Sequence, residues 1–488
     1  MVSIESLAFA KHMKSTIKLL AVVVALGLLS AVAVRAFSLT GPLKTWQVQR
    51  IGYDIQGDIG GPMNLGEFYR VNVPVVTYAY DSSFLNYFGT NGIAAIETVM
   101  KFMNDLPPMS SITNDGVNFF INGLPVPFDP KFINFEAQNL GLQDIKATAW
   151  GHLLEEMGLN SPERWVWALR SRVITPGPGT NYAIFKVNFD PITLAPSSFV
   201  NEQLYGFTIV DGQTISDAIE SALIPDVVPF TSVAGLNAFP GDFFTGLSHD
   251  DIGGLKYLYS TNRMAVETLL PTVTPRGPGG GTGTNFVNAP WTPVFLITNV
   301  FTNIAGTNIT TSNTLVNVAP RPGVNKIFFQ RVEFDSIIGN FIPRTNIFAD
   351  VFFTNSRPRF QMVQRGIGTP DYIFTVEDLG TSPISGFPFQ SARTTAGGWI
   401  NNDLINGNSP LFGPGVITLP IQITFTDLYP AFFTSVPFID FADGSSPSGA
   451  GIWGSFDGTT NPPAVYPQFG NWNLNALRNA ALGGGVQP

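Results

Sequence analysis

One stretch of the sequence is too rich in glycine and proline to form a packed helix or strand. Residues 272–287 contain five glycines and two prolines, and a chain of that composition behaves as a flexible connection. The sequence therefore predicts a linker at 272–287, which separates a unit at 37–271 from a unit at 288–472. The remaining tail, 473–488, is rich in small and polar residues.

The part before the linker mixes strand and helix patterns, which predicts an α+β fold. Residues 73–80 have the β-branched and aromatic side chains of a strand. Apolar residues at three-and-four spacing predict a helix at 92–106, and two prolines end it. Further helices are predicted at 142–157, 161–170 and 250–259.

The part after the linker contains short strand-like runs. They are rich in Ile, Val, Phe and Thr and are separated by Pro, Gly and Asn. Many short strands without helices predict an all-β, sandwich-like unit, followed by one short helix near 474–482 in the tail. The runs are 295–301, 326–333, 346–353, 372–376 and 421–427.

The N-terminus has the parts of a secretory signal peptide. Three lysines precede an apolar run, 19–34, that is too short to span a bilayer comfortably. The small residues Val34 and Ala36 suit the −3 and −1 positions of a signal-peptidase site. We therefore expect residues 1–36 to be removed and the protein to be secreted, to the extracellular space or the cell envelope. An uncleaved membrane anchor is the alternative, and Met13 is a second candidate start.

Charge and cysteine content exclude several classes of function. The chain has 26 Lys and Arg and 35 Asp and Glu, and removing residues 1–36 takes away four and one of these, which leaves a net charge of −12. Nucleic acids and anionic lipids bind clustered Lys and Arg, so neither is an expected partner. The absence of cysteine excludes a cysteine nucleophile. No serine-hydrolase elbow, phosphate loop, dinucleotide fingerprint or later membrane span is present.

Two segments look like parts of one known family. Residues 147–159, Ala-Thr-Ala-Trp-Gly-His-Leu-Leu-Glu-Glu-Met-Gly-Leu, have the shape of a zinc-protease active-site helix. Residues 247–259, Leu-Ser-His-Asp-Asp-Ile-Gly-Gly-Leu-Lys-Tyr-Leu-Tyr, resemble the closing helix of the same family. With the strand and long helix before them, they make residues 63–260 resemble matrixin-type zinc endopeptidases, a branch of the metzincins. The resemblance implies a mixed sheet with helices and does not extend to the β-rich half.

The catalytic residues that the resemblance implies are missing. The family signature is His-Glu-x-x-His-x-x-Gly-x-x-His, and aligning its Leu-Gly-Leu on 157–159 puts the three zinc ligands at Gly151, Glu155 and Ser161. The general base falls on His152. None of these is the residue that zinc hydrolysis requires, so the resemblance implies a catalytically inactive relative, a pseudoenzyme.

A non-standard metal site is the alternative. His152 and Glu156 are four residues apart and share a helix face, which echoes the inverted signature His-x-x-Glu-His. A third ligand could come from His249 or a distant carboxylate, and a peptidase there would use His152 with Glu155 or Glu156. The simpler interpretation is a hydrogen bond between His152 and Glu156, with His249 on the surface and Asp144, Glu155 and Glu156 as helix-surface acids. Zinc is therefore not an expected cofactor.

Two further patterns could bind ligands. Residues 441–448 gather oxygen-bearing side chains around a glycine, as in a calcium loop, but lack the spacing of known loops. Calcium is therefore not expected either. The aromatic pairs Trp165 and Trp167, and Phe432 and Phe433, are interpreted as core residues, with a sugar-stacking surface as the alternative.

The sequence favours one function and leaves a second open. The first is an exported, non-enzymatic structural or binding protein of the cell surface or extracellular matrix. Its partner would be a second copy, another surface protein or a polysaccharide, and apolar runs such as 347–353 could pair between copies if they lie at a sheet edge. The second is a secreted metal-dependent peptidase with a site around His152 and Glu155 or Glu156.

Overall fold

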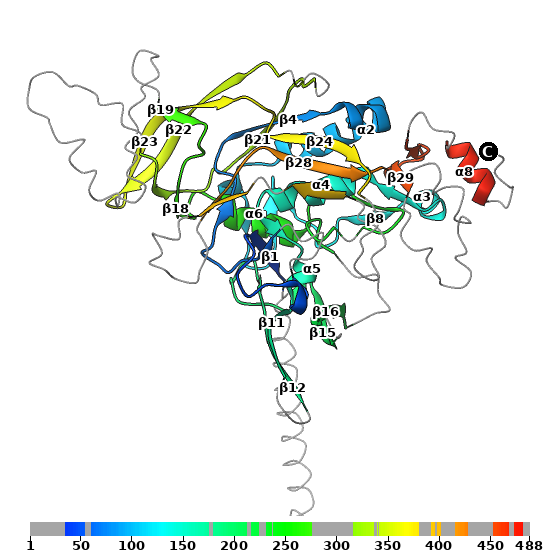
Figure 1. Cartoon of the computed structure of the whole chain (residues 1–488), viewed down its shortest axis with the longest axis horizontal. Helices are drawn as coiled ribbons and strands as arrows, with labels where there is room; N and C mark the ends of the chain where they lie inside the picture. Colours follow the sequence, from blue (N-terminus) through cyan, green and yellow to red (C-terminus); the bar gives the residue numbers. More distant parts are fainter. Residues whose placement is uncertain are drawn as a thin grey trace, which may run out of the picture.

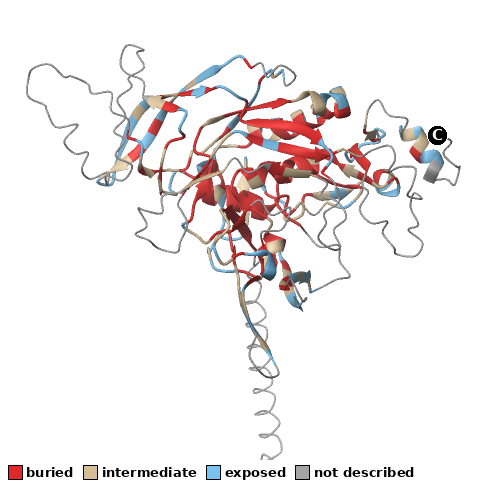
Figure 2. Cartoon of the chain, in the orientation of Figure 1, coloured by how far each residue is buried: buried red, intermediate tan, exposed pale blue. Residues whose placement is uncertain are grey.

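Strands are numerous and helices few in this protein, which is compatible with the α+β and all-β character predicted for its two parts. Most buried side chains belong to one large core, which surrounds the central sheet and its helices (Figure 2). The computed structural model describes residues 35–53, 60–174, 179–211, 216–223, 231–236, 238–275, 316–335, 339, 341–379, 392–395, 398–401, 415–427, 452–467 and 473–481.

The core is built on a five-stranded sheet with the order β21–β4–β24–β28–β25. The first four strands run parallel to one another, and β25 is antiparallel to its neighbour β28. The five strands are β4 (Val75–Tyr80), β21 (Phe328–Arg331), β24 (Tyr372–Glu377), β25 (Ala392–Thr395) and β28 (Ile421–Thr426). The two central strands of this order that lie between parallel neighbours, β4 and β24, are almost completely buried, as parallel strands in a covered sheet usually are.

Strands from both sides of the predicted linker share this sheet. β4 precedes residues 272–287, yet it lies between β21 and β24, which follow them. The linker itself begins with a strand, β19 (Val273–Pro275), which pairs with β23 (Arg357–Ile367). The chain therefore does not divide there into an α+β unit at 37–271 and a separate β-sandwich at 288–472. Local patterns indicate where strands form, whereas the partner of each strand depends on contacts between distant residues.

Two long helices lie against the central sheet (Figure 1). α2 (Ser82–Asp105) contacts β21 and β24, and α4 (Ile145–Glu156) contacts α2, β25 and β28. α2 begins well before its predicted start at residue 92, because the Asp81 carboxylate caps it by accepting a hydrogen bond from the Phe84 backbone N–H at 2.9 Å. Gly89, with a φ of 58°, interrupts the helical backbone. This break separates the first turns of α2 from the regularly spaced apolar residues that follow.

The other helices agree with the sequence in two places and differ in one. α6 (His249–Tyr259) and α8 (Leu474–Ala481) lie where helices are predicted. The helix predicted at 161–170 is only one turn long, α5 (Pro162–Trp165), because the chain continues as a strand from Ala168. The remaining described helical segments are α3 (Phe135–Asn139) and the 3-10 turns η1 (Gln49–Ile51) and η2 (Met109–Ser111).

Several small sheets surround the core, and some of these also join distant parts of the chain. β3 pairs with β27, and β9 pairs with β29, both in parallel. The strands of these sheets are β1 (Phe37–Gly41), β2 (Gly61–Pro62), β3 (Tyr69–Arg70), β5 (Thr113–Asn114), β6 (Phe119–Ile121), β7 (Leu124–Pro125), β8 (Lys131–Ile133), β9 (Leu142–Asp144), β10 (Leu159–Asn160), β13 (Asn188–Phe189), β17 (Asp242–Phe244), β18 (Ala265–Glu267), β20 (Ala319–Arg321), β26 (Trp399–Asn401), β27 (Gly415–Ile417), β29 (Ile452–Ser455) and β30 (Ala464–Val465).

Antiparallel hairpins extend from this body. β11 pairs with β12, which reaches away from the core on one side (Figure 1). β22 and β23 pair without a break over eleven residues and lie at the end of the molecule opposite α8 (Figure 1). The strands not yet given are β11 (Ala168–Ile174), β12 (Thr180–Phe185), β14 (Phe199–Val200), β15 (Gln203–Asp211), β16 (Ser216–Ala222) and β22 (Arg344–Thr354).

The last two residues of the predicted signal peptide, Arg35 and Ala36, belong to the fold. Their side chains are 1% and 0% exposed, and the strand β1 follows them directly. Residues 1–34 lie outside the described part of the chain. Within that part, no helix combines the length and the apolar composition that crossing a membrane requires.

Candidate functional site

The candidate residues lie on α4, which is almost completely buried. Asp144 caps the helix, because its Oδ2 accepts a hydrogen bond from the Ala147 backbone N–H at 3.3 Å. Gly158, with a φ of 102°, lets the chain turn after the helix in a conformation that other residues rarely adopt. Asp144 was predicted to be a surface acid, but it is buried, and desolvation raises its pKa to about 7. The helix therefore faces the core.

The first implied ligand position, Gly151, is filled by a neighbouring loop. A Cβ at this position would lie 2.2 Å from Leu236 Cδ2 and 2.8 Å from the Val233 carbonyl oxygen. Separations this short do not occur between real atoms, so any side chain here must displace the loop. The space that a zinc ligand would need is occupied by protein.

Two buried carboxylates hold this loop, residues 231–236, in place. Asp251 accepts hydrogen bonds from two of its backbone N–H groups, at 2.9 and 3.1 Å. Glu163 accepts one from a third backbone N–H at 2.8 Å and one from the Thr231 hydroxyl at 2.7 Å. Because buried hydrogen bonds are costly to break, the loop is a fixed part of the core.

His152 pairs with Glu155 and not, as predicted, with Glu156. Its Nδ1 lies 3.1 Å from Glu155 Oε2, one turn along the helix. Glu156 is buried beside Thr394 of the central sheet. Desolvation, and then the neighbouring charge of Glu155, raise the pKa of Glu156 well above its usual range, which favours the neutral acid. The hydrogen-bond partner of His152 is therefore Glu155, three positions along the helix. Glu156, four positions along, is buried in the core instead.

His249 was predicted on the surface, but it is completely buried. Its ring stacks on Phe119, with centroids 4.5 Å apart, and lies 5.1 Å from the ring of Phe128. Arg35 Nη1 donates a hydrogen bond to His249 Nε2 at 3.1 Å. Burial, and then the charge of Arg35, lower the pKa of His249 to about 3, so the imidazole is neutral near pH 7. The aromatic residues that enclose it come from a distant segment, so the local sequence did not indicate its burial.

The ligands of the alternative metal site are not brought together. Over the described ranges, no three His, Asp or Glu side chains are grouped as a metal ion would require. His152, Glu156 and His249 each contribute to the packing of their own surroundings instead. Ser161, the third implied ligand position, caps α5, because its Oγ accepts a hydrogen bond from the Arg164 backbone N–H at 3.3 Å.

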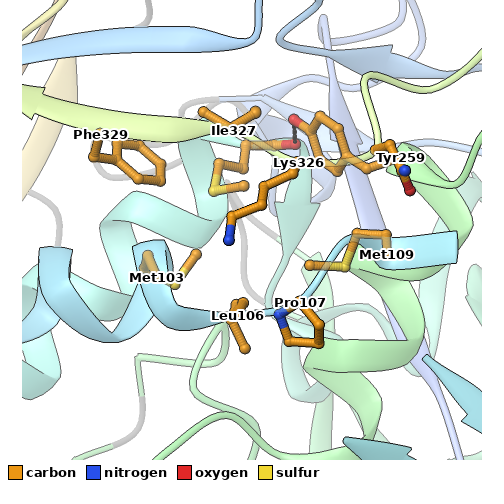
Figure 3. Close-up of a pocket in the computed structure, with 10 residues that line it drawn as sticks. Met103, Leu106, Pro107, Met109, Tyr259, Lys326, Ile327 and Phe329 are labelled. Carbon is orange, nitrogen blue, oxygen red and sulfur yellow. Dashed lines mark hydrogen bonds between the residues drawn. The ribbon is translucent and has the colours of Figure 1, made fainter. Parts of the chain in front are cut away.

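A small cavity lies beside the C-terminal end of α4 (Figure 3). Its volume is about 20 Å³, enough for one water molecule. Methionine and other apolar side chains form most of its wall, and the Lys326 side chain extends into it (Figure 3). No carboxylate or imidazole lines it.

The other ligand patterns give no site in the described residues. Trp165 is part of a buried cluster and stacks on Tyr53 at 5.2 Å, as a core residue would. Trp167 is half-buried between Phe207, at 5.0 Å, and the Lys186 ammonium. The calcium pattern at 441–448 and the pair at 432–433 lie outside the described residues.

One surface, which includes part of the apolar run 347–353, is exposed and apolar. It consists of Ile347 and Val351 on β22 and Phe360 and Met362 on β23, and we call it the β22–β23 surface. Phe360 is 77% exposed, and the other three are 41–45% exposed. The strand register places Val351 opposite Phe360 and Ala349 opposite Met362, so these side chains share one face of the hairpin.

The opposite face of β22 is covered, and one of its edges pairs with no strand among the described residues. Asp350 is buried there, and Arg321 donates two hydrogen bonds to its carboxylate at 2.8 and 2.9 Å. Phe352 packs on the same side against Val316. Across the residues that the structure describes, β22 pairs with β23 alone and therefore forms the edge of the sheet β19–β23–β22. The apolar run at 347–353 indicated this strand, but not which face meets solvent.

No protein-family model matches the chain, and neither a curated protein nor a solved structure is significantly similar to it. The resemblance to matrixins therefore rests only on the sequence pattern within residues 63–260. Function must be inferred from the chain itself, chiefly from the filled position at Gly151 and from the β22–β23 surface.

Proposed function

We propose that this protein is an exported, non-enzymatic structural protein of the cell surface or extracellular matrix, whose copies associate through the open edge of β22. Export is inferred from the basic and apolar sequence at 1–36. The self-association rests on one observation, a long edge strand flanked by exposed apolar side chains. An edge of this kind is a template for pairing with another chain unless it is protected.

Two features that often protect an edge strand, a proline and a β-bulge, are absent from β22. It contains no proline, and its pairing with β23 has no bulge. Its two charged residues are Arg344, at the first position, and Asp350, whose charge is neutralised by Arg321 on the covered face. Nothing in the centre of the strand therefore repels a second copy.

A two-fold arrangement would extend the apolar face across the contact. If two β22 strands pair antiparallel about Ala349, Ile347 of one copy lies opposite Val351 of the other. Because Val351 already lies opposite Phe360, the apolar row would continue from one hairpin into the next. Each cross-strand pair of this kind contributes about 0.2–1 kcal/mol, in addition to the new backbone hydrogen bonds.

The filled space at Gly151 supports the non-enzymatic part of the proposal. We infer that the region containing α2, α4 and α6 is a matrixin-like arrangement without catalytic residues. Leu236 and Val233 occupy the space beside the first ligand position, and Ser161 is used as a helix cap. A metal-dependent peptidase around His152 would need these groups to move.

Light scattering and negative-stain electron microscopy of the exported protein test the proposal. We expect dimers or longer assemblies for the natural chain. Val351→Glu and Phe360→Glu should each weaken association at least about tenfold, since a charge would enter an apolar row, equivalent to about 1.4 kcal/mol. Phe135→Glu is the matched control, because Phe135 is 71% exposed but lies on α3.

Three results would contradict self-association through this edge. They are a natural protein that stays monomeric at all concentrations, variants that associate as strongly as the natural chain, and a control variant that loses association equally. Bound zinc and proteolysis that both disappear in His152→Ala would instead favour the peptidase. If the protein is monomeric and binds a polysaccharide or another surface protein in a pull-down, that molecule would be its partner instead of a second copy.

A further inference from the structure

Arg35 occupies a closed socket although it precedes the first strand. Its side chain is 1% exposed, and its guanidinium lies 4.4 Å from the centre of the Phe128 ring. Nη1 donates a hydrogen bond to the neutral His249 ring at 3.1 Å, and Nη2 lies 3.6 Å from Glu202 Oε1. An aromatic face, an imidazole and a carboxylate thus surround one cation from three separate parts of the chain.

Ala36 is tied to a buried carboxylate in the same place. Its backbone N–H donates a hydrogen bond to Asp250 Oδ2 at 3.0 Å, and the Asn201 backbone N–H donates a second at 2.6 Å. Asp250 is completely buried, and Arg35 is the cation whose charge favours its ionised form. Without Arg35 and Ala36, Asp250 would lose a donor and this cation, and His249 would lose its donor.

A cut between Ala36 and Phe37 would remove both of these residues. Buried polar groups that lose their partners destabilise a fold strongly, more so when one of them is charged. The N-terminal sequence offers another site three residues earlier, where Ala31 and Ala33 provide the small residues at −3 and −1. A cut there leaves both Arg35 and Ala36 in the exported protein.

We propose that export processing cuts the Ala33–Val34 peptide bond, so that Arg35 is a structural residue of the mature protein. A signal peptidase would hydrolyse this bond with one water molecule, leaving a carboxylate on Ala33 and an amine on Val34. The mature chain then begins at Val34, directly before Arg35 and Ala36. This inference rests on the proposed export, but not on self-association through β22.

Intact mass and N-terminal sequencing of the exported natural protein test the cut directly. We expect a chain that begins at Val34, three residues longer than one that begins at Phe37. A chain that begins at Phe37 would overturn the inference while leaving export intact. A cell-bound chain that retains its N-terminus would overturn both the inference and export, whereas self-association is measured separately on the purified protein.

A variant tests the choice of site without touching the folded protein's socket. Ala33→Leu should block cleavage after residue 33, so that uncut precursor accumulates in the cells. If processing occurs after Ala36, the same variant should release mature protein of unchanged mass, which would overturn the inference. Because the readout is a mass in whole cells and medium, it does not depend on how well the variant folds.

Two further variants test the role of Arg35 in the mature fold. Arg35→Ala should lower the thermal midpoint by several degrees, because it removes the hydrogen-bond donor to His249 and the cation beside the buried Asp250. Arg50→Ala is the matched control, since Arg50 is exposed on η1, and it should not change the midpoint. Equal midpoints for the two variants would show that Arg35 does not stabilise the protein and would count against its retention.

Discussion

The α4 region and the β22–β23 surface differ in how their side chains meet solvent. α4 carries the residues that look like a catalytic motif, yet its polar groups pair internally and a loop fills the space beside Gly151. β22 and β23 carry no motif, yet they expose apolar side chains beside an open strand edge. A sequence that resembles a catalytic motif can therefore act in packing, and an ordinary strand sequence can provide a surface for association.

The largest expected effect concerns the attachment of β22 to the core. Arg321→Met removes the partner of the buried Asp350, and breaking one side of a buried ion pair costs about 3–5 kcal/mol. Chemical denaturation should show this loss, and self-association should weaken with it. Arg359→Met, on the exposed end of β23, is the control. A loss below about 1 kcal/mol would mean that the β22–β23 surface forms without this pair.

The next effect is a pH dependence that comes from Asp144. Its folded pKa is raised to about 7, so the stability it contributes is full below about pH 4 and is lost as the pH rises towards 7. Asp144→Asn keeps an N-cap and should remove up to roughly 1.4 kcal/mol per pH unit of that decline. The pH dependence that comes from His249 has the opposite sign, because its lowered pKa makes stability fall as the pH drops below about 6.5.

Thermal or chemical unfolding at pH 4 and pH 8 measures this difference. The Asn variant should gain stability relative to the natural protein as the pH rises. Identical pH profiles for the two proteins would mean that Asp144 is ionised normally, and hence that α4 is open to solvent.

A smaller effect is expected from filling the space beside Gly151. Gly151→Ala should cost about 1–3 kcal/mol, since its Cβ would overlap Leu236 and the Val233 carbonyl. Gly368→Ala is the matched control, because nothing lies within 4 Å of a Cβ there. If denaturation shows that Gly151→Ala is neutral or stabilising, the loop 231–236 moves at little cost. The space beside Gly151 would then not be firmly closed.

The smallest effect is expected at His152. His152→Ala removes one hydrogen bond to Glu155 and should cost only about 0.5–1.5 kcal/mol. Metal analysis of the natural protein and the variant should find the same zinc content, and neither should cleave peptides. A zinc ion lost with the imidazole would bring α4 back into consideration as a catalytic region.

The sequence by itself determined much of the local structure. Apolar spacing and the cap Ser248 indicated α6, the β-branched runs indicated β4, β24 and β28, and the residues at 151, 155 and 161 showed that the zinc ligands are missing. These features depend on neighbours within a few residues, and such interactions can be evaluated from the order of the side chains alone.

Only the tertiary structure decided which distant residues meet. It placed β4 between two strands from beyond the predicted linker, enclosed His249 between Phe119 and Phe128, and set Leu236 beside Gly151. It also left one edge of β22 without a partner strand in the described part of the chain, and buried Arg35 against α6. Burial and pairing depend on which surfaces come together in three dimensions, and the same local sequence is compatible with several such arrangements.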